Sequence, residues 1–125
     1  AVLALGEISR ELLTPCGLRT LGPESPGYRG RFKGGMVDLD AAYHQGTVWP
    51  WLMGPYVTAL VKLTGDQAEA RRVLRGAREM LVEHGLGGIS EVYDGDEPRS
   101  AAGCPWQAWS TAEYLRAWIE DAGGR

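Results

Sequence analysis

The chain has 125 residues and a formal net charge of −3, and hydrophobic residues make up 44% of it. This length and composition suffice for one hydrophobic core and therefore one domain. The Lys and Arg residues form no basic stripe and no apolar run is long enough to cross a bilayer, so we expect neither nucleic-acid nor membrane binding.

The first predicted element is a helix that runs to about Leu13, in the segment AVLALGEISRELL. This segment has no initiator Met and no capping residue before it, so we expect the chain to be a piece of a longer one. Residues 14 to 42 follow as a long loop rich in Gly and Pro, and LGPESPGYRGRFKGG (residues 21–35) within it has neither helical nor strand periodicity. Loops of this length inside a compact domain are usually functional or disordered.

A second helix is predicted from about Thr47 to Leu63, where apolar side chains recur at helical spacing. Pro50 suits its first turn. Pro55 should kink it, because proline cannot donate a backbone hydrogen bond and its ring crowds the carbonyl of Trp51.

A third helix is predicted from Asp66 to Gly85. Asp66 can cap its start, and Glu69 stands where it would complete a capping box. The expected apolar face consists of Ala70, Val73, Leu74, Ala77, Met80 and Leu81.

A fourth helix is predicted from about Pro105 to Asp121. Its expected inward-facing residues are Ala108, Trp109, Ala112, Leu115, Trp118 and Ile119. No segment indicates a strand longer than three residues, and the only candidates for short bridges lie around Tyr28 to Phe32 and Ile89 to Val92. The sequence therefore predicts an all-α fold with long loops, and such loops are where a site is usually built.

Two loop–helix junctions place polar groups beside indole rings. AYHQGTVWPW (residues 42–51) offers His44 and Gln45 beside Trp49, and GCPWQAWSTAE (residues 103–113) offers Gln107 beside Trp109. Neutral hydrogen-bonding groups next to flat apolar surfaces suit ligands rich in hydroxyl groups. The alternative is that these indoles are core residues near helix ends.

A third segment, GGISEVYDGD (residues 87–96), concentrates Glu91, Asp94 and Asp96 behind two glycines. It can be a solvated acidic turn or part of a catalytic loop. Asp94 and Asp96 are expected to fix the loop through Asx-type turns, and Asp94 is also a candidate for contact with a sugar hydroxyl.

Other chemistry has little support in the sequence. His44 and His84 are far apart and neither has a partner at metal-ligand spacing, so no metal or other cofactor is expected. Nothing places a base beside Cys16 or Cys104, and both are expected as free thiols, as in cytosolic proteins.

Three separated motifs carry a family resemblance. They are LLTPCGLRTL, AYHQGTVWPWLMGPY and GGISEVYDGDEPRSAAGCPWQAWSTAEYLRAW, in this order over nearly the whole chain. Together they resemble the C-terminal end of bacterial and archaeal glycogen debranching enzymes of the amylo-α-1,6-glucosidase type. The family usually has an Arg-Asp pair before the second motif, where this chain has Leu39 and Asp40.

The resemblance implies a fold and a reaction. Residues 1–125 would be the C-terminal part of a cytoplasmic catalytic domain, an (α/α)6 toroid, with the remainder of that domain as partner. The reaction would be hydrolysis, with inversion, of α-1,6-linked glucose at branch points of glycogen or limit dextrin. Inversion requires an acid and a base. Glu91 would be the base, and the acid an Asp upstream of residue 1.

The same resemblance implies a glucose-binding wall. Its expected members are Tyr43, His44, Gln45, Trp49, Asp94, Gln107 and Trp109. Two alternatives stay open: another (α/α)6 hydrolase of α-glucans, similar to glucoamylase, and a helical carbohydrate-binding or interaction module without turnover.

Overall fold

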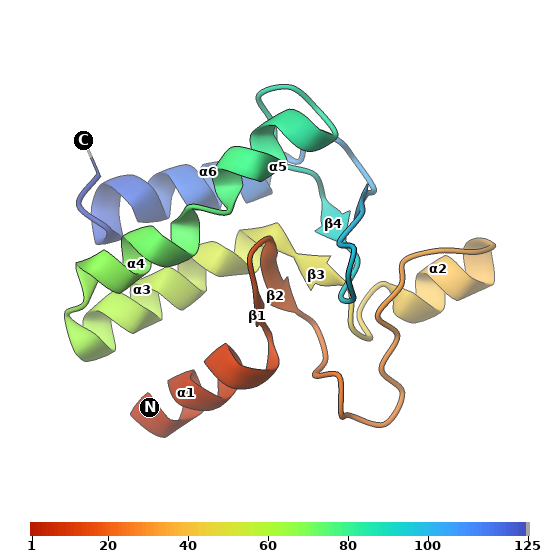
Figure 1. The fold of residues 1–125 in the computed structure, drawn as a ribbon, viewed down its shortest axis with the longest axis horizontal. Coiled ribbons are helices and arrows are strands. Elements are labelled where there is room, and N and C mark those ends of the chain that lie inside the picture. The colour runs from red at the N-terminus through yellow and green to blue at the C-terminus, as the bar shows by residue number, and fades with distance from the viewer. Residues whose placement is uncertain (125) are drawn as a thin grey trace.

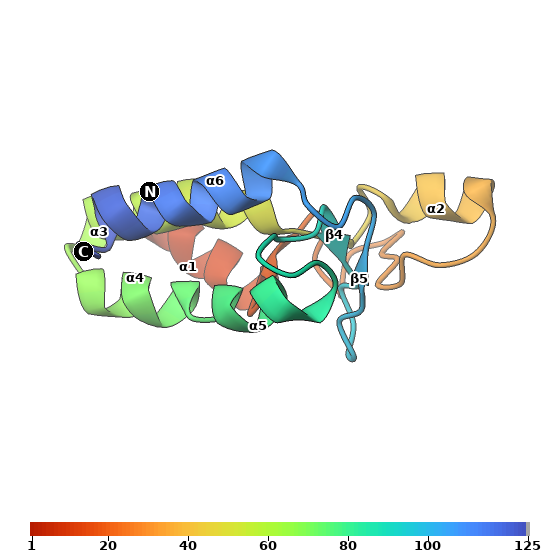
Figure 2. The ribbon, with the colours of Figure 1, turned by 90° about the horizontal axis from the view of Figure 1, so that it is seen from above.

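The structure is a computed structural model that describes residues 1–124. Helices α3 (Met53–Thr64), α4 (Gln67–Leu74) and α6 (Ala108–Arg116) pack together at one end, with α1 (Val2–Glu11) beside them (Figure 1). Helix α2 (Met36–Ala42) stands apart at the other end, and a small sheet lies between (Figure 1 and Figure 2). The chain is therefore rich in helix, but the all-α prediction is incomplete because strands are present.

The sheet is antiparallel throughout, and its strands follow one another in sequence order. The strands are β1 (Leu13–Thr14), β2 (Gly17–Arg19), β3 (Val48–Trp49), β4 (Val92–Tyr93) and β5 (Ala101–Ala102). None exceeds three residues, as expected, and β4 overlaps one of the two candidate bridge segments. The register pairs Leu18 with Trp49 and Val48 with Tyr93, so β3 lies in the middle.

The second predicted helix begins later than expected. Val48 and Trp49 belong to β3 because strands on both sides take their backbone hydrogen bonds. A 3₁₀ turn, η1 (Pro50–Leu52), follows, and α3 begins at Met53. Pro55 is thus in the first turn of α3, where proline is best tolerated. The kink at Pro55 stays a prediction.

The third predicted helix is two helices, α4 and α5 (Ala77–Glu83). The predicted cap at Asp66 is confirmed, since its side chain accepts a hydrogen bond from Glu69 N at 2.9 Å. Glu69 does not complete the box and pairs with Arg72 instead. The break lies at Gly76, where the carbonyl of Pro15 occupies the space of a β-carbon. The predicted apolar face still packs inward, with Ala70, Val73, Leu74 and Met80 buried.

The inward face of α6 is not the predicted one. Ser110, Tyr114 and Ala117 are buried against the core. All six residues predicted to face inward are exposed, namely Ala108, Trp109, Ala112, Leu115, Trp118 and Ile119. We call these six residues the outer face of α6. The helix continues into a π-helical turn, η2 (Ala117–Asp121).

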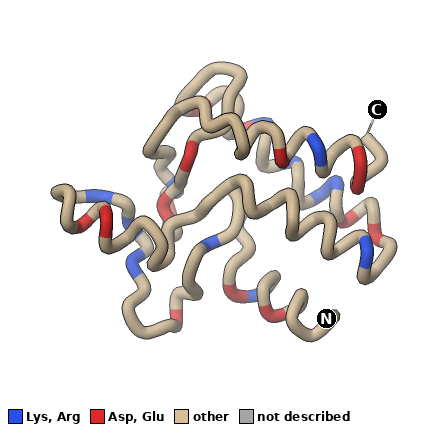
Figure 3. The backbone as a smooth tube through the Cα atoms, turned by 180° about the vertical axis from the view of Figure 1, so that it is seen from behind, with Lys and Arg blue, Asp and Glu red and all other residues tan. Residues whose placement is uncertain are grey.

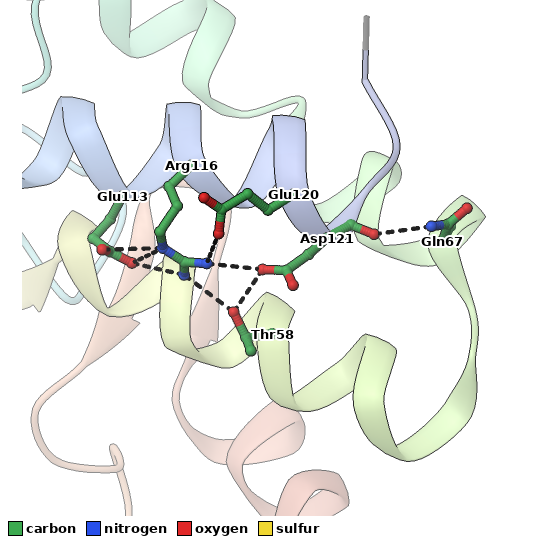
Figure 4. A network of polar contacts seen from close by, with 6 residues as sticks. All are labelled: Thr58, Gln67, Glu113, Arg116, Glu120 and Asp121. Carbon is green, nitrogen blue, oxygen red and sulfur yellow. Dashed lines mark hydrogen bonds and ion pairs between the residues drawn. The ribbon is translucent and has the colours of Figure 1, made fainter.

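A polar network joins α6 and η2 to α3 (Figure 4). Arg116 donates to Glu113, Glu120 and Asp121, and to the hydroxyl of Thr58 on α3 at 3.1 Å. Thr58 in turn donates to Asp121 at 2.6 Å. Hydrogen bonding to Glu113 raises the pKa of Arg116 further above its ordinary value. The network fixes how α6 lies on α3, and hence which face of α6 stays outside.

Charged residues are spread along the described chain, with no single basic stripe (Figure 3). No helix within residues 1–124 has the length and apolar character needed to span a membrane. The long segment predicted to lack structure contains α2 as well as β2. Its first part pairs in the sheet, and its middle, residues 28–32, lies against the loop after β4.

Candidate functional site

Glu91 lies directly before β4 and is held by the segment before α6. Its N–H donates to Cys104 O at 2.9 Å, and Cys104 N–H donates to Glu91 Oε2 at 3.0 Å. The neighbouring Gly103 has φ +70°, and a β-carbon there would stand 2.5 Å from Oε2. Only glycine combines this backbone conformation with so close an approach. Two backbone hydrogen bonds and a glycine therefore set the position of the carboxylate.

The second oxygen of Glu91 accepts a hydrogen bond from Tyr43. This residue ends α2, and its hydroxyl donates to Glu91 Oε1. Burial, followed by the hydrogen bond to Glu91, raises the pKa of Tyr43 to about 12. The hydroxyl therefore keeps its proton at neutral pH and can serve as a donor. Each carboxylate oxygen thus has one fixed donor and a lone pair left over.

A row of aromatic rings leads away from this carboxylate. Tyr43 meets Trp49 edge to face at 4.7 Å, and Trp49 meets Trp109 edge to face at 5.9 Å. Trp109 stacks on Trp51 with ring centroids 5.3 Å apart, and His44 stacks on Trp49 at 5.3 Å. The two residues that follow α2, with residues of β3, η1 and α6, thus form one aromatic surface beside Glu91, which we call the aromatic wall.

The residues of the aromatic wall, and the two glutamines expected to act with them, differ in exposure. Trp49 is only 5% exposed, and its Nε1 donates to Tyr43 O at 2.9 Å. Trp109 is 46% exposed. His44 and Gln45 are exposed, whereas Gln107 is half-buried at the N-cap of α6. Trp109, His44 and Gln45 can therefore meet a ligand directly, while Trp49 supports the wall from behind.

The two aspartates hold the loop, but not by the expected Asx-type turns. Asp94 is 7% exposed and accepts hydrogen bonds from Phe32 N at 2.7 Å and Arg31 Nη1 at 3.2 Å. Asp96 accepts one from the Tyr28 hydroxyl at 2.9 Å. Both carboxylates thus tie the loop after β4 to residues 28–32. Contact between Asp94 and a sugar stays a prediction.

The structure brings several residues to this site that were not among the expected site residues. Phe32 lies 5.6 Å from the Tyr43 ring, and Trp51 stacks on Trp109. Gly103 and Cys104 touch Glu91 through their backbone. Trp51, Gly103 and Cys104 lie inside the two quoted loop–helix motifs, but a backbone contact such as that of Gly103 and Cys104 leaves no trace in side-chain chemistry.

The other cysteine lies in a different part of the surface. Cys16 lines a hollow of about 440 Å³ together with residues of α5 and Arg99. Burial raises the pKa of the Cys16 thiol to about 11, which disfavours the nucleophilic thiolate. Both cysteines are free thiols, as predicted. No group of three or more His, Cys, Asp or Glu side chains within residues 1–124 could hold a metal ion.

Comparison with known proteins places the chain beside a described family and a curated relative. The family described as Amylo-alpha-1,6-glucosidase matches residues 1–116. A glycogen debranching enzyme of Saccharomyces cerevisiae is 28% identical over 138 residues. That alignment covers 92% of this chain and 9% of the yeast protein, so the chain spans a small part of that relative's length.

Proposed function

Because the chain belongs to the amylo-alpha-1,6-glucosidase family, we propose that it forms part of a catalytic domain that hydrolyses α-1,6-linked glucose at branch points of glycogen or limit dextrin. The yeast relative bears the name glycogen debranching enzyme, which favours a branched α-glucan as substrate. In this proposal the chain supplies the general base and part of the glucose-binding wall.

The observation that carries the proposal is the carboxylate of Glu91, fixed by donors on both oxygens beside the aromatic wall. An inverting glycosidase needs a carboxylate that activates water on one face of the sugar and a carboxylic acid on the other. The two stand about 6.5–9.5 Å apart, with the water between them. Glu91 is suited to the first role, and the rest of the domain would bring the acid.

The exposed part of the aromatic wall, together with Gln45 and Gln107, supplies the proposed sugar contacts. Trp109 and His44 present ring faces, and the amides of Gln45 and Gln107 present donors and acceptors for hydroxyl groups. A pyranose ring has apolar C–H faces and a polar rim, so this pairing of flat rings with amides matches it.

The outer face of α6 supports the wider architecture. Trp118 and Ile119 are 38% and 56% exposed, and Leu115 is 59% exposed. A helix normally buries such an apolar stripe against a neighbour. In the proposal these residues pack against further helical hairpins of an (α/α)6 toroid.

The test is Glu91→Gln in the protein that contains this chain together with the rest of its catalytic domain. Glutamine keeps the shape of glutamate but cannot take a proton from water. Glucose release from a branched limit dextrin should fall by about 10²–10⁴-fold, the usual contribution of a general base. The matched control is Glu97→Gln, an exposed glutamate on the loop after β4, which should retain activity.

Two results would contradict this assignment. Glu91→Gln with the parental rate would exclude Glu91 as the base, and a parent without turnover on any α-glucan would favour a binding module. A glucoamylase-like enzyme differs in substrate: it would release glucose from linear α-1,4-linked chains at least as fast as from the branched dextrin.

A further inference from the structure

We infer that Tyr43 is a positioning residue, whose hydroxyl holds the Glu91 carboxylate in the orientation that accepts the proton of the attacking water. This inference rests on the proposed function and changes the expected part of Tyr43, from contact with the sugar to contact with the base. In the step concerned, the water O–H bond breaks, its proton goes to a free lone pair of Glu91, and its oxygen forms the bond to the sugar carbon. The glycosidic C–O bond breaks at the same carbon, and the leaving oxygen takes a proton from the acid that the rest of the domain would bring.

The first support is the set of contacts around Tyr43. Its ring lies against Phe32 at 5.6 Å, His44 at 4.8 Å and Trp49 at 4.7 Å. Its carbonyl accepts the hydrogen bond of Trp49 Nε1 at 2.9 Å. The ring is therefore held on several sides, and it brings a hydroxyl of fixed position to Glu91. A donor placed in this way needs no reorganisation during the reaction.

The other carboxylate oxygen of Glu91, Oε2, is also held in place. Cys104 N–H donates to Oε2 at 3.0 Å, and Gly103 leaves no room for Oε2 to move toward it. With Oε1 bound to the Tyr43 hydroxyl, rotation of the carboxylate would break both hydrogen bonds. Without Tyr43, only one donor would remain and the carboxylate could turn about its last side-chain bond.

The hydroxyl proton of Tyr43 is already used in the hydrogen bond to Glu91. The raised pKa, about 12, keeps the hydroxyl protonated, and its single proton already lies in the bond to Glu91. The hydroxyl therefore has no donor left for a sugar. Its proton therefore acts on the carboxylate and not on a sugar.

The test is Tyr43→Phe in the protein that carries the complete catalytic domain, with kcat and KM measured on branched limit dextrin. Phenylalanine keeps the ring packing and removes only the hydroxyl. A hydrogen bond to a charged group should be worth about tenfold to a hundredfold in kcat, and KM should stay within about twofold. The matched control is Tyr28→Phe, which removes the hydroxyl bound to Asp96 and should leave kcat within about twofold.

A double-mutant cycle separates positioning from substrate contact. In a Glu91→Ala background, Tyr43→Phe should change the residual rate of glucose release by less than about twofold, because the group on which Tyr43 acts is gone. An equal fall in both backgrounds, or a raised KM with unchanged kcat, would overturn this inference and leave the proposed function standing. A parental kcat in Glu91→Ala would instead overturn the proposed function, and this inference with it.

A second variant covers the case in which Tyr43→Phe does not fold. Gly103→Ala adds a β-carbon 2.5 Å from Oε2 and disturbs the same carboxylate from the other side. It should lower kcat with KM nearly unchanged. A parental kcat in a folded Gly103→Ala protein would contradict the view that the orientation of Glu91 limits the reaction.

Discussion

Trp49 and Trp109 meet edge to face, yet they differ in burial and therefore in expected role. Trp49 is 5% exposed, lies in the central strand of the sheet and gives its indole N–H to Tyr43. Trp109 is 46% exposed and stacks on Trp51 at the start of α6. The sequence places each tryptophan at a loop–helix junction and does not distinguish them.

The two tryptophans should therefore respond differently to replacement by alanine. Trp49→Ala removes a buried indole and should lower the free energy of unfolding by about 3–5 kcal/mol, measured by denaturant unfolding. Trp109→Ala should leave the fold intact and weaken substrate use by about 1–3 kcal/mol, if stacking on a sugar resembles stacking on a base. Each variant serves as control for the other. A folded Trp49→Ala protein with only a raised KM would show that this indole contacts substrate.

At the level of elements, the break between α4 and α5 lies beside a residue that is distant in sequence. Gly76 has helical dihedral angles, φ −56° and ψ −25°, so its own backbone is compatible with a continuous helix. The carbonyl of Pro15, in the turn between β1 and β2, occupies the place of its β-carbon. The glycine allows the sheet to approach the helix pair.

Gly76→Ala should consequently destabilise the protein, although alanine is the better helix former. Helix propensity alone would stabilise by about 0.5–1 kcal/mol, whereas the forced contact with Pro15 should cost about 1–3 kcal/mol. The control is Gly6→Ala in α1, where no atom lies within 4 Å of the added β-carbon and stability should rise. Thermal unfolding of both variants gives the comparison. A stabilised Gly76→Ala protein would mean that the turn at Pro15 moves away from the added β-carbon with little loss of free energy.

For the molecule as a whole, the outer face of α6 is notable because it is largely apolar and yet exposed. Its apolar side chains, with Trp106 at 62% exposure before them, form part of the surface. Exposed apolar patches of this kind mark interaction surfaces or cause association.

The isolated chain should therefore associate, and Leu115→Glu combined with Ile119→Lys should reduce that association. The measurement is sedimentation velocity over a range of concentrations, together with binding of a dye for apolar surface. The control is Leu3→Glu on α1, where the leucine is 91% exposed but lies on a different helix. A parental chain that stays monomeric on concentration and binds no dye would contradict the view that this face packs against further helices. The isolated chain should also release no glucose, because inversion needs an acid as well as a base.

Local patterns in the sequence predicted the elements that depend on nearby residues. The cap at Asp66, the apolar face from Ala70 to Met80 and a helix before Asp121 all follow from interactions within a few positions. The motifs around Tyr43, Glu91 and Trp109 also predicted the family, which the match over residues 1–116 confirms.

Contacts between distant residues decided the rest. Val48 and Trp49 continue a helical pattern, but strands from residues 17–19 and 92–93 pair with them, because a short strand is stabilised by its neighbours more than by its own sequence. On α6 the more polar side, Ser110 and Tyr114, faces the core, since Arg116 and Thr58 fix the helix on α3. The hydrogen bonds from Tyr43 and Cys104 to Glu91 likewise join three segments that are distant in sequence, and only folding brings these segments together.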